Sequence, residues 1–180
     1  MIKIYSARHG ETVRNAQNRI SGRVDVSLSE KGREQAQMLA LQMSTRGIDL
    51  IISSPMIRAQ ETSKAAAEMC RVPIITDERL IEQDYGVYEG VYMNTPEFKR
   101  FLENKRHFAY RYPGGESMMD VAYRVYGLLH DIKRDYDGKT VLLVSHGGVC
   151  RVMHTYFNDM TNDEFYNFLL DNCEFREYEL

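Results

Sequence analysis

The sequence lacks most of the features that mark secreted, disulfide-stapled or membrane-spanning proteins. It has only three cysteines among 180 residues, an odd number with no CxxC pair, so it predicts neither a disulfide framework nor a zinc site. Its longest apolar runs, such as residues 141–144, have the length of a strand and are too short to cross a bilayer. Residues 1–5 lack the basic region and long apolar stretch of a signal peptide. We therefore expect a cytoplasmic protein with no membrane partner.

The chain also lacks the excess of positive charge that is typical of nucleic-acid-binding proteins. Its net charge is -3, so we expect no nucleic-acid partner. The charge is unevenly spread. Residues 1–34 hold seven Lys or Arg and four Asp or Glu, a net +3, whereas residues 159–180 hold one Arg and seven Asp or Glu, a net -6. A basic first segment is compatible with a small anionic ligand.

A hydrophobic content of 43% over 180 residues is ample for one domain, 1–180, and short for two. Strands are predicted at 2–7, 49–53, 72–76, 140–145 and, as an edge strand, 173–178. Helices are predicted at 30–46, 56–70 and 96–105, then from 117 and from about 149. Strands that alternate with helices predict an α/β fold, a three-layer sandwich with a mainly parallel central sheet flanked by helices. The irregular middle of the chain predicts a lid or insertion around 91–115.

Polar residues follow three of the predicted strands. Arg8, His9 and Gly10 follow the first strand, Arg58 lies just beyond the second, and His146 follows the fourth. The carboxyl ends of parallel strands line one crevice, so we expect these side chains to meet there. Guanidinium forks and the backbone N–H groups of neighbouring glycines suit a phosphate dianion. No GxxxxGK[ST] segment occurs, and two histidines beside arginines make a poor cation site, so we expect no metal.

With their neighbours, these residues resemble the histidine phosphatase superfamily, also called phosphoglycerate-mutase-like. The resemblance covers most of the chain, and its segments occur in the family's order. They are 8–12 (RHGET) with Asn15, Ser21-Gly22, Asp25, 28–32 (LSEKG), 53–59 (SSPMIRA), 80–82 (LIE), Gly86 with Glu89-Gly90, 113–117 (PGGES) and 144–148 (VSHGG).

The resemblance implies a mechanism and a set of site residues. His9 would attack phosphorus and become transiently phosphorylated, and Glu82 would give a proton to the departing alcohol and later activate water. The implied catalytic residues are His9, Glu82, Arg8, Arg58 and His146, of which the last three would hold the phosphoryl oxygens. The implied phosphate- and substrate-binding residues are Arg8, Asn15, Ser21, Gly22, Arg58, Glu82, His146 and Gly147. The resemblance implies no cofactor.

We expect a metal-independent phosphatase that hydrolyses small phosphomonoesters. The chain resembles the phosphatase branch in residues 86–90 and 113–117, and it lacks the extra sequence that family mutases carry after the acid-bearing segment. These reasons rest on analogy, so two alternatives stay open. One is a cofactor-dependent phosphoglycerate mutase, and the other is a catalytically silent domain that binds phospholigands.

Some features concern specificity. Arg14 and Arg23 stand where the family often has aromatic residues, so they lie either on the rim of the site, favouring a second anionic group, or on the solvated surface. Aromatic and basic residues interleave over 98–112, the part that folds over the site in the family, and His107 is a candidate for substrate contact. We expect a small phosphorylated metabolite as partner. Monomer and homodimer both stay open, although charged residues blunt the edge strand near the C-terminus.

Overall fold

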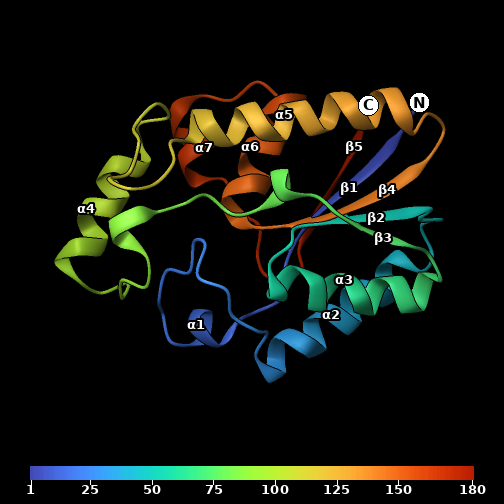
Figure 1. Ribbon diagram of the computed structural model, residues 1–180, viewed down its shortest axis with the longest axis horizontal. Helices are drawn as coiled ribbons and strands as arrows, with labels where there is room; N and C mark the ends of the chain where they lie inside the picture. Colours follow the sequence, from blue (N-terminus) through green and yellow to red (C-terminus); the bar gives the residue numbers. More distant parts are fainter.

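The computed structural model describes residues 1–180 and has three layers, with the sheet between two sets of helices (Figure 1). The strands are β1 (Lys3–Arg8), β2 (Leu50–Ser53), β3 (Ile74–Thr76), β4 (Thr140–Ser145) and β5 (Phe175–Glu179). They lie in the order β3-β2-β4-β1-β5, and all pairs are parallel except β1 with β5. The mainly parallel sheet and the edge position of the last strand are thereby confirmed.

Helices cover both faces of the sheet. The helices α5 (Met118–Asp135) and α6 (Gly147–Phe157) lie on one face, and α2 (Glu30–Met43) and α3 (Ile57–Cys70) lie on the other (Figure 1). Alternate residues of β4 serve the two layers, since Val141 and Leu143 pack with α5 and α6 while Leu142 and Val144 pack with α2 and α3. All four are fully buried. A continuous apolar run is what a central parallel strand requires.

The remaining elements are short. They are α1 (Val13–Ala16), α4 (Pro96–Lys105), α7 (Asn162–Asn167) and the 3-10 turns η1 (Glu78–Leu80) and η2 (Gly86–Tyr88). Of these, only α4 was predicted, because the others are too short to show a periodic pattern. Capping boxes begin both α1 and α7, at Thr12 and Thr161. No helix in the fold combines the length and the apolar character needed to cross a bilayer.

Several predicted boundaries differ from the structure, among them the start of β5, which lies at Phe175 rather than at Cys173. The helix α2 ends at Met43 rather than near Arg46, and β3 begins at Ile74 rather than at Val72. The helix α6 begins at Gly147, two residues earlier than expected, with His146 as its N-cap residue. Glycine has a low intrinsic helix propensity, so this early start is a tertiary effect that the local sequence does not indicate.

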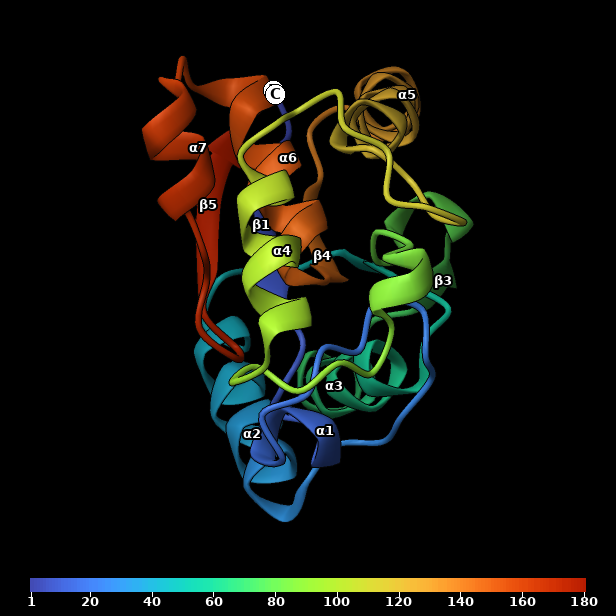
Figure 2. The same ribbon diagram turned by 90° about the vertical axis from the view of Figure 1, so that its left-hand side faces the viewer.

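The segment 91–115 lies over the carboxyl end of the sheet. In Figure 2, α4 stands in front of β1, β4 and the start of α6. A small core formed by Ile20, Phe101 and Tyr112 packs this segment against Tyr85 and Tyr88. Five residues of 91–115 line the cavity described below, namely Met93, Phe98, Phe101, Leu102 and Lys105. Closure of this segment as a lid stays a prediction.

Candidate active site

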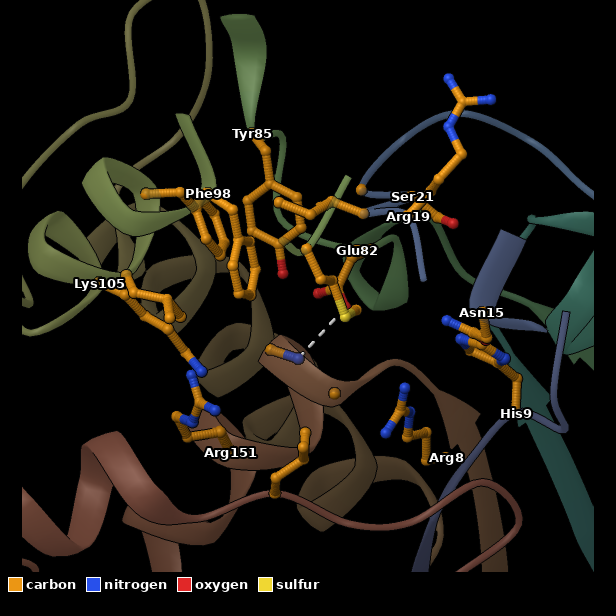
Figure 3. Close-up of a pocket in the computed structure, with 18 of the residues that line it drawn as sticks. Arg8, His9, Asn15, Arg19, Ser21, Glu82, Tyr85, Phe98, Lys105 and Arg151 are labelled. Carbon is orange, nitrogen blue, oxygen red and sulfur yellow. Dashed lines mark hydrogen bonds between the residues drawn. The ribbon is translucent and has the colours of Figure 1, made fainter. Parts of the chain in front are cut away.

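A cavity of about 340 Å³ lies at the carboxyl ends of β1 and β4 (Figure 3). All of the predicted catalytic and substrate-binding residues except His146 line it, namely Arg8, His9, Asn15, Ser21, Gly22, Arg58, Glu82 and Gly147. Phe98 and Lys105, from the predicted lid, also line it, together with side chains that the sequence did not single out, among them Arg19, Tyr85 and Arg151. The structure therefore gathers at one place residues from nearly the whole length of the chain, from Arg8 to Leu169.

His9 lies at the end of β1 and is held in one tautomer. Its Nδ1 is 2.7 Å from the carbonyl oxygen of Gly10, and because a carbonyl oxygen only accepts, Nδ1 carries the proton. Its Nε2 therefore has a free lone pair, which accepts a hydrogen bond of 3.2 Å from Arg58 Nε. Burial, with the charges of Arg58 and Arg8, holds the pKa of His9 well below its usual value. A neutral imidazole with a lone pair on Nε2 is the form that acts as a nucleophile.

Two side chains that sequence reasoning missed fix the backbone of this turn. The Gly10 N–H donates to Thr62 Oγ1 at 3.1 Å, and Asn172 Nδ2 donates to the His9 carbonyl oxygen at 2.9 Å. Thr62 also donates to the carbonyl oxygen of Arg58, which ties the two halves of the site together. No local signal in the sequence marks either residue, since each acts on a segment that is at least 52 positions away.

Arg58 lies in the first turn of α3 and is almost wholly buried. Its Nη1 donates to the carbonyl oxygen of Val24 at 3.0 Å, and its Nη2 donates to that of Gly22 at 2.7 Å. Its Nε faces both His9 and His146. Burial lowers its pKa, yet a guanidinium keeps its charge at any relevant pH. Arg58 therefore brings a fixed positive charge to within 3.2 Å of the His9 nitrogen.

His146 differs from expectation, because its ring does not line the cavity. It is fully buried, with its ring centroid 5.1 Å from that of His9. Its Nδ1 accepts from Arg58 Nε at 3.1 Å, so the proton lies on Nε2, which donates to Ser54 Oγ at 2.7 Å. Burial and the Arg58 charge hold its pKa well below the usual value. In this arrangement His146 positions Arg58, and its direct contact with a phosphoryl oxygen stays a prediction.

Several donors at the cavity have no partner within the protein. Arg8 Nη1 donates to the carbonyl oxygen of Leu170 at 2.7 Å, but the buried Arg8 Nε has no acceptor. The buried hydroxyl of Ser21 also has none. Asn15 Oδ1 accepts from Thr12, which leaves its amide N–H groups for the cavity beside His9 (Figure 3). Since buried polar groups are nearly always hydrogen-bonded, these donors suit an anionic ligand.

Glu82 supplies the carboxylate at the cavity. Its Oε2 accepts from the Gly148 N–H at 3.2 Å, and its Oε1 accepts from the Gln83 N–H at 2.8 Å. A side chain on Gly148 would prevent this approach, because its Cβ would lie 2.6 Å from Oε1. Gly147 is the first residue of α6, so its N–H is among those without an acceptor inside the helix. The start of α6 therefore presents positive potential to both Glu82 and the cavity.

The rim hypothesis for Arg14 and Arg23 is not supported by the structure, because neither residue lines the cavity. Arg23 forms an ion pair with Glu116 at 2.9 Å instead. His107 is exposed and lies outside the cavity lining as well. The cations that do line it are those of Arg19, Lys105 and Arg151, besides Arg8 and Arg58.

The two buried histidines predict that the protein loses stability in acid. Their pKa values are well below 6.5 in the folded state, so below about pH 6.5 the unfolded chain binds more protons. Each histidine should lower the free energy of unfolding by about 1 kcal/mol between pH 7 and pH 5.5. Urea unfolding at both pH values measures this loss. His9→Asn should lose about 1 kcal/mol less than the wild type over the same interval, and equal losses would contradict the assignment.

Comparisons with known proteins identify the family of this chain. Residues 4–180 match the profile of the histidine phosphatase superfamily, branch 1. Phosphoserine phosphatase 1 of Hydrogenobacter thermophilus is 33% identical over 97% of this chain and 85% of its own length. A probable phosphoglycerate mutase GpmB of an Enterobacter species is 41% identical over 82% of this chain and 70% of its own.

Among solved structures, mycobacterial glucosyl-3-phosphoglycerate phosphatase in complex with VO3 superposes with a TM-score of 0.86 at 26% identity. The match covers 97% of this chain and 90% of that one. Phosphatases among the similar proteins support phosphatase activity for this site. From the profile match and the relatives together, the chain belongs to branch 1 of the histidine phosphatase superfamily.

Proposed function

We propose that this protein is a phosphatase that hydrolyses small phosphomonoesters through a phosphohistidine intermediate on His9. The observation that carries the proposal is the state of His9, which is neutral and has its Nε2 lone pair beside the Arg58 guanidinium. A phosphoryl group that reaches this nitrogen also meets the unpartnered donors of Arg8 and Ser21. The expected partner is a small phosphorylated metabolite.

In the first step, a phosphoryl oxygen of the substrate replaces His9 Nε2 as the acceptor of the hydrogen bond from Arg58 Nε. His9 Nε2 then forms a bond to phosphorus as the ester P–O bond breaks. The departing oxygen takes its proton from Glu82, while Arg8 and Arg58 stabilise the charge on the equatorial oxygens. The bond from Nδ1 to the Gly10 carbonyl oxygen stabilises the phosphorylated ring, which is then positively charged.

In the second step, the Glu82 carboxylate removes a proton from water, and the water oxygen attacks phosphorus. The P–N bond breaks, inorganic phosphate leaves, and His9 returns to its neutral form while Glu82 keeps the proton for the next cycle. In the free enzyme Glu82 is held by two backbone N–H groups, so its position is fixed before substrate binds.

Mutase activity is the second candidate, because the chain is 41% identical to a probable phosphoglycerate mutase. Incubation with 3-phosphoglycerate distinguishes the two, with products identified by phosphorus NMR. The proposal expects inorganic phosphate and an unphosphorylated acid. Formation of 2-phosphoglycerate, dependent on a bisphosphate primer and without phosphate release, would favour the mutase.

Glu82→Gln is expected to separate substrates by their leaving groups. An alkyl phosphate needs a proton on its departing oxygen, so kcat/KM, which reports the first step, should fall on the order of 10³-fold. 4-Nitrophenyl phosphate has a better leaving group and should lose less than about tenfold in the first step. Gly148→Ala should give the same pattern, since a Cβ there would displace the Glu82 carboxylate. Equal losses of kcat/KM for both substrates would contradict the role of Glu82 as acid.

A further inference from the structure

Three cations that line the cavity have no part in the steps above, and two of them, Lys105 and Arg151, lie together (Figure 3). Lys105 is the last residue of α4, and Arg151 lies on α6. Their side chains point toward one another across the cavity from His9, with Arg8 and Glu82 between (Figure 3). None of the ion pairs in the structure includes Lys105 or Arg151.

Arg151 is held so that one edge of its guanidinium is left for the cavity. The side chain is 2% exposed, and its Nε donates to the carbonyl oxygen of Phe168 at 2.8 Å. Its Cζ lies 5.6 Å from the ring centroid of Phe165. These contacts engage the Nε atom of Arg151 and one face of its guanidinium plane. Neither of its two Nη atoms takes part in them. A guanidinium edge of this kind matches the two oxygens of a carboxylate.

Lys105 is packed beside this charge. Its Nζ lies 5.3 Å from the centroid of the Tyr166 ring on α7. Burial and the Arg151 charge lower the pKa of Lys105 to about 7, with Glu82 acting in the opposite direction and Arg8 in the same direction. Glu82 does not pair with it, since its oxygens accept from backbone N–H groups. Two positive charges in a partly dehydrated cavity repel each other, and an anion that binds between them offsets this repulsion.

We propose that Lys105 and Arg151 bind a carboxylate at the far end of the substrate, so that the protein acts on phosphorylated hydroxy acids. This inference rests on the proposed function, because it assigns the substrate class of the same site. Phe98, Phe101 and Leu102 form an apolar wall in the same cavity, suited to a short carbon chain between the two anions. Arg19 is less suited, because its guanidinium points away from Lys105 and Arg151 (Figure 3).

A matched pair of substrates tests the proposal. 3-Phosphoglycerate and glycerol 3-phosphate share a three-carbon chain and differ in having a carboxylate or a hydroxymethyl group at the far end. We expect the wild type to favour 3-phosphoglycerate by at least about tenfold in kcat/KM, as a charged hydrogen bond provides. Lys105→Met should lower this ratio about tenfold. Lys99→Met, on the exposed face of the same helix, is the matched control and should leave the ratio unchanged.

Arg151→Met gives a second measurement of the ratio, and Arg151→Lys guards against loss of folding because it keeps a charge at this buried position. A wild type that hydrolyses both substrates equally would overturn the subsite and leave the phosphatase proposal standing. A ratio that Lys105→Met and Arg151→Met leave unchanged would also overturn it.

Binding measurements keep the subsite testable even if no hydrolysis occurs. On a His9→Ala background, calorimetry should give a Kd for 3-phosphoglycerate at least about tenfold below that for glycerol 3-phosphate. Repeating the titrations at pH 7 in buffers of different ionisation enthalpy gives the number of protons taken up on binding. The protein should take up more protons with 3-phosphoglycerate than with glycerol 3-phosphate, because the carboxylate favours the charged form of Lys105. Lys105→Met should abolish this difference. Equal Kd values for the two compounds, or equal proton uptake, would overturn the proposal.

Discussion

Replacing His9 by alanine is expected to lower kcat at least about 10⁴-fold, which corresponds to about 5.5 kcal/mol of transition-state stabilisation. Alanine offers no nitrogen to attack phosphorus, and no other nucleophile lies where His9 Nε2 meets Arg58. The fold should stay intact, because the imidazole makes only two hydrogen bonds and packs at the edge of the core. Phosphate release from an alkyl phosphate measures the loss.

The covalent intermediate gives a sharper test of the same residue. Wild-type protein quenched after brief exposure to a labelled phosphomonoester should retain acid-labile phosphate, and His9→Ala should retain none. His107→Ala is the matched control, since His107 is exposed and outside the cavity. Acid-labile label on the His9→Ala protein would assign the nucleophile to another residue.

The second large effect is expected at Arg58. Arg58→Met should reduce kcat/KM on the order of 10³-fold, because one of the two guanidinium clamps on the phosphoryl oxygens is lost. It should also lower the free energy of unfolding by about 2 kcal/mol, since the carbonyl oxygens of Gly22 and Val24 lose their donor. The loss is not larger because methionine avoids the free-energy penalty of burying a charged guanidinium, which offsets part of the cost of the lost hydrogen bonds.

Kinetics with 3-phosphoglycerate and urea unfolding measure the two effects of this change separately. Arg100→Met, an exposed arginine on α4, is the control and should affect neither quantity. Arg58→Lys should fall between the wild type and Arg58→Met in activity, because it keeps the charge but loses the fork geometry. Full activity in Arg58→Met, once folding is verified, would contradict a role for this guanidinium in phosphoryl transfer.

Much of the fold follows from local patterns in the sequence. The apolar run at residues 140–145 specifies a strand buried on both faces, and the sheet places it centrally, between β1 and β2. Ser29 and Ser117 cap the helices that they were predicted to begin. The placement of Arg8, His9 and Arg58 near one another also follows, because the carboxyl ends of parallel strands meet at one edge.

Other parts of the site were decided by tertiary structure alone. His146 was expected to face the ligand, but its ring is turned to Arg58 and Ser54, and no sequence pattern encodes a side-chain direction. Thr62 and Asn172 support His9 from distant segments.

The same limit applies to the proposed carboxylate subsite. Lys105 ends an amphipathic helix and Arg151 lies within one, so both have the sequence pattern of ordinary helical cations. The sequence by itself determined the strands and the longer helices, because those depend on periodicity, and the hypothesis that His9 is the nucleophile came from the resemblance of its motif to the family's. Only the tertiary arrangement that brings α4 and α6 to the same cavity decided which cations meet across from His9, because the relative placement of helices that are distant in the chain leaves no local signal.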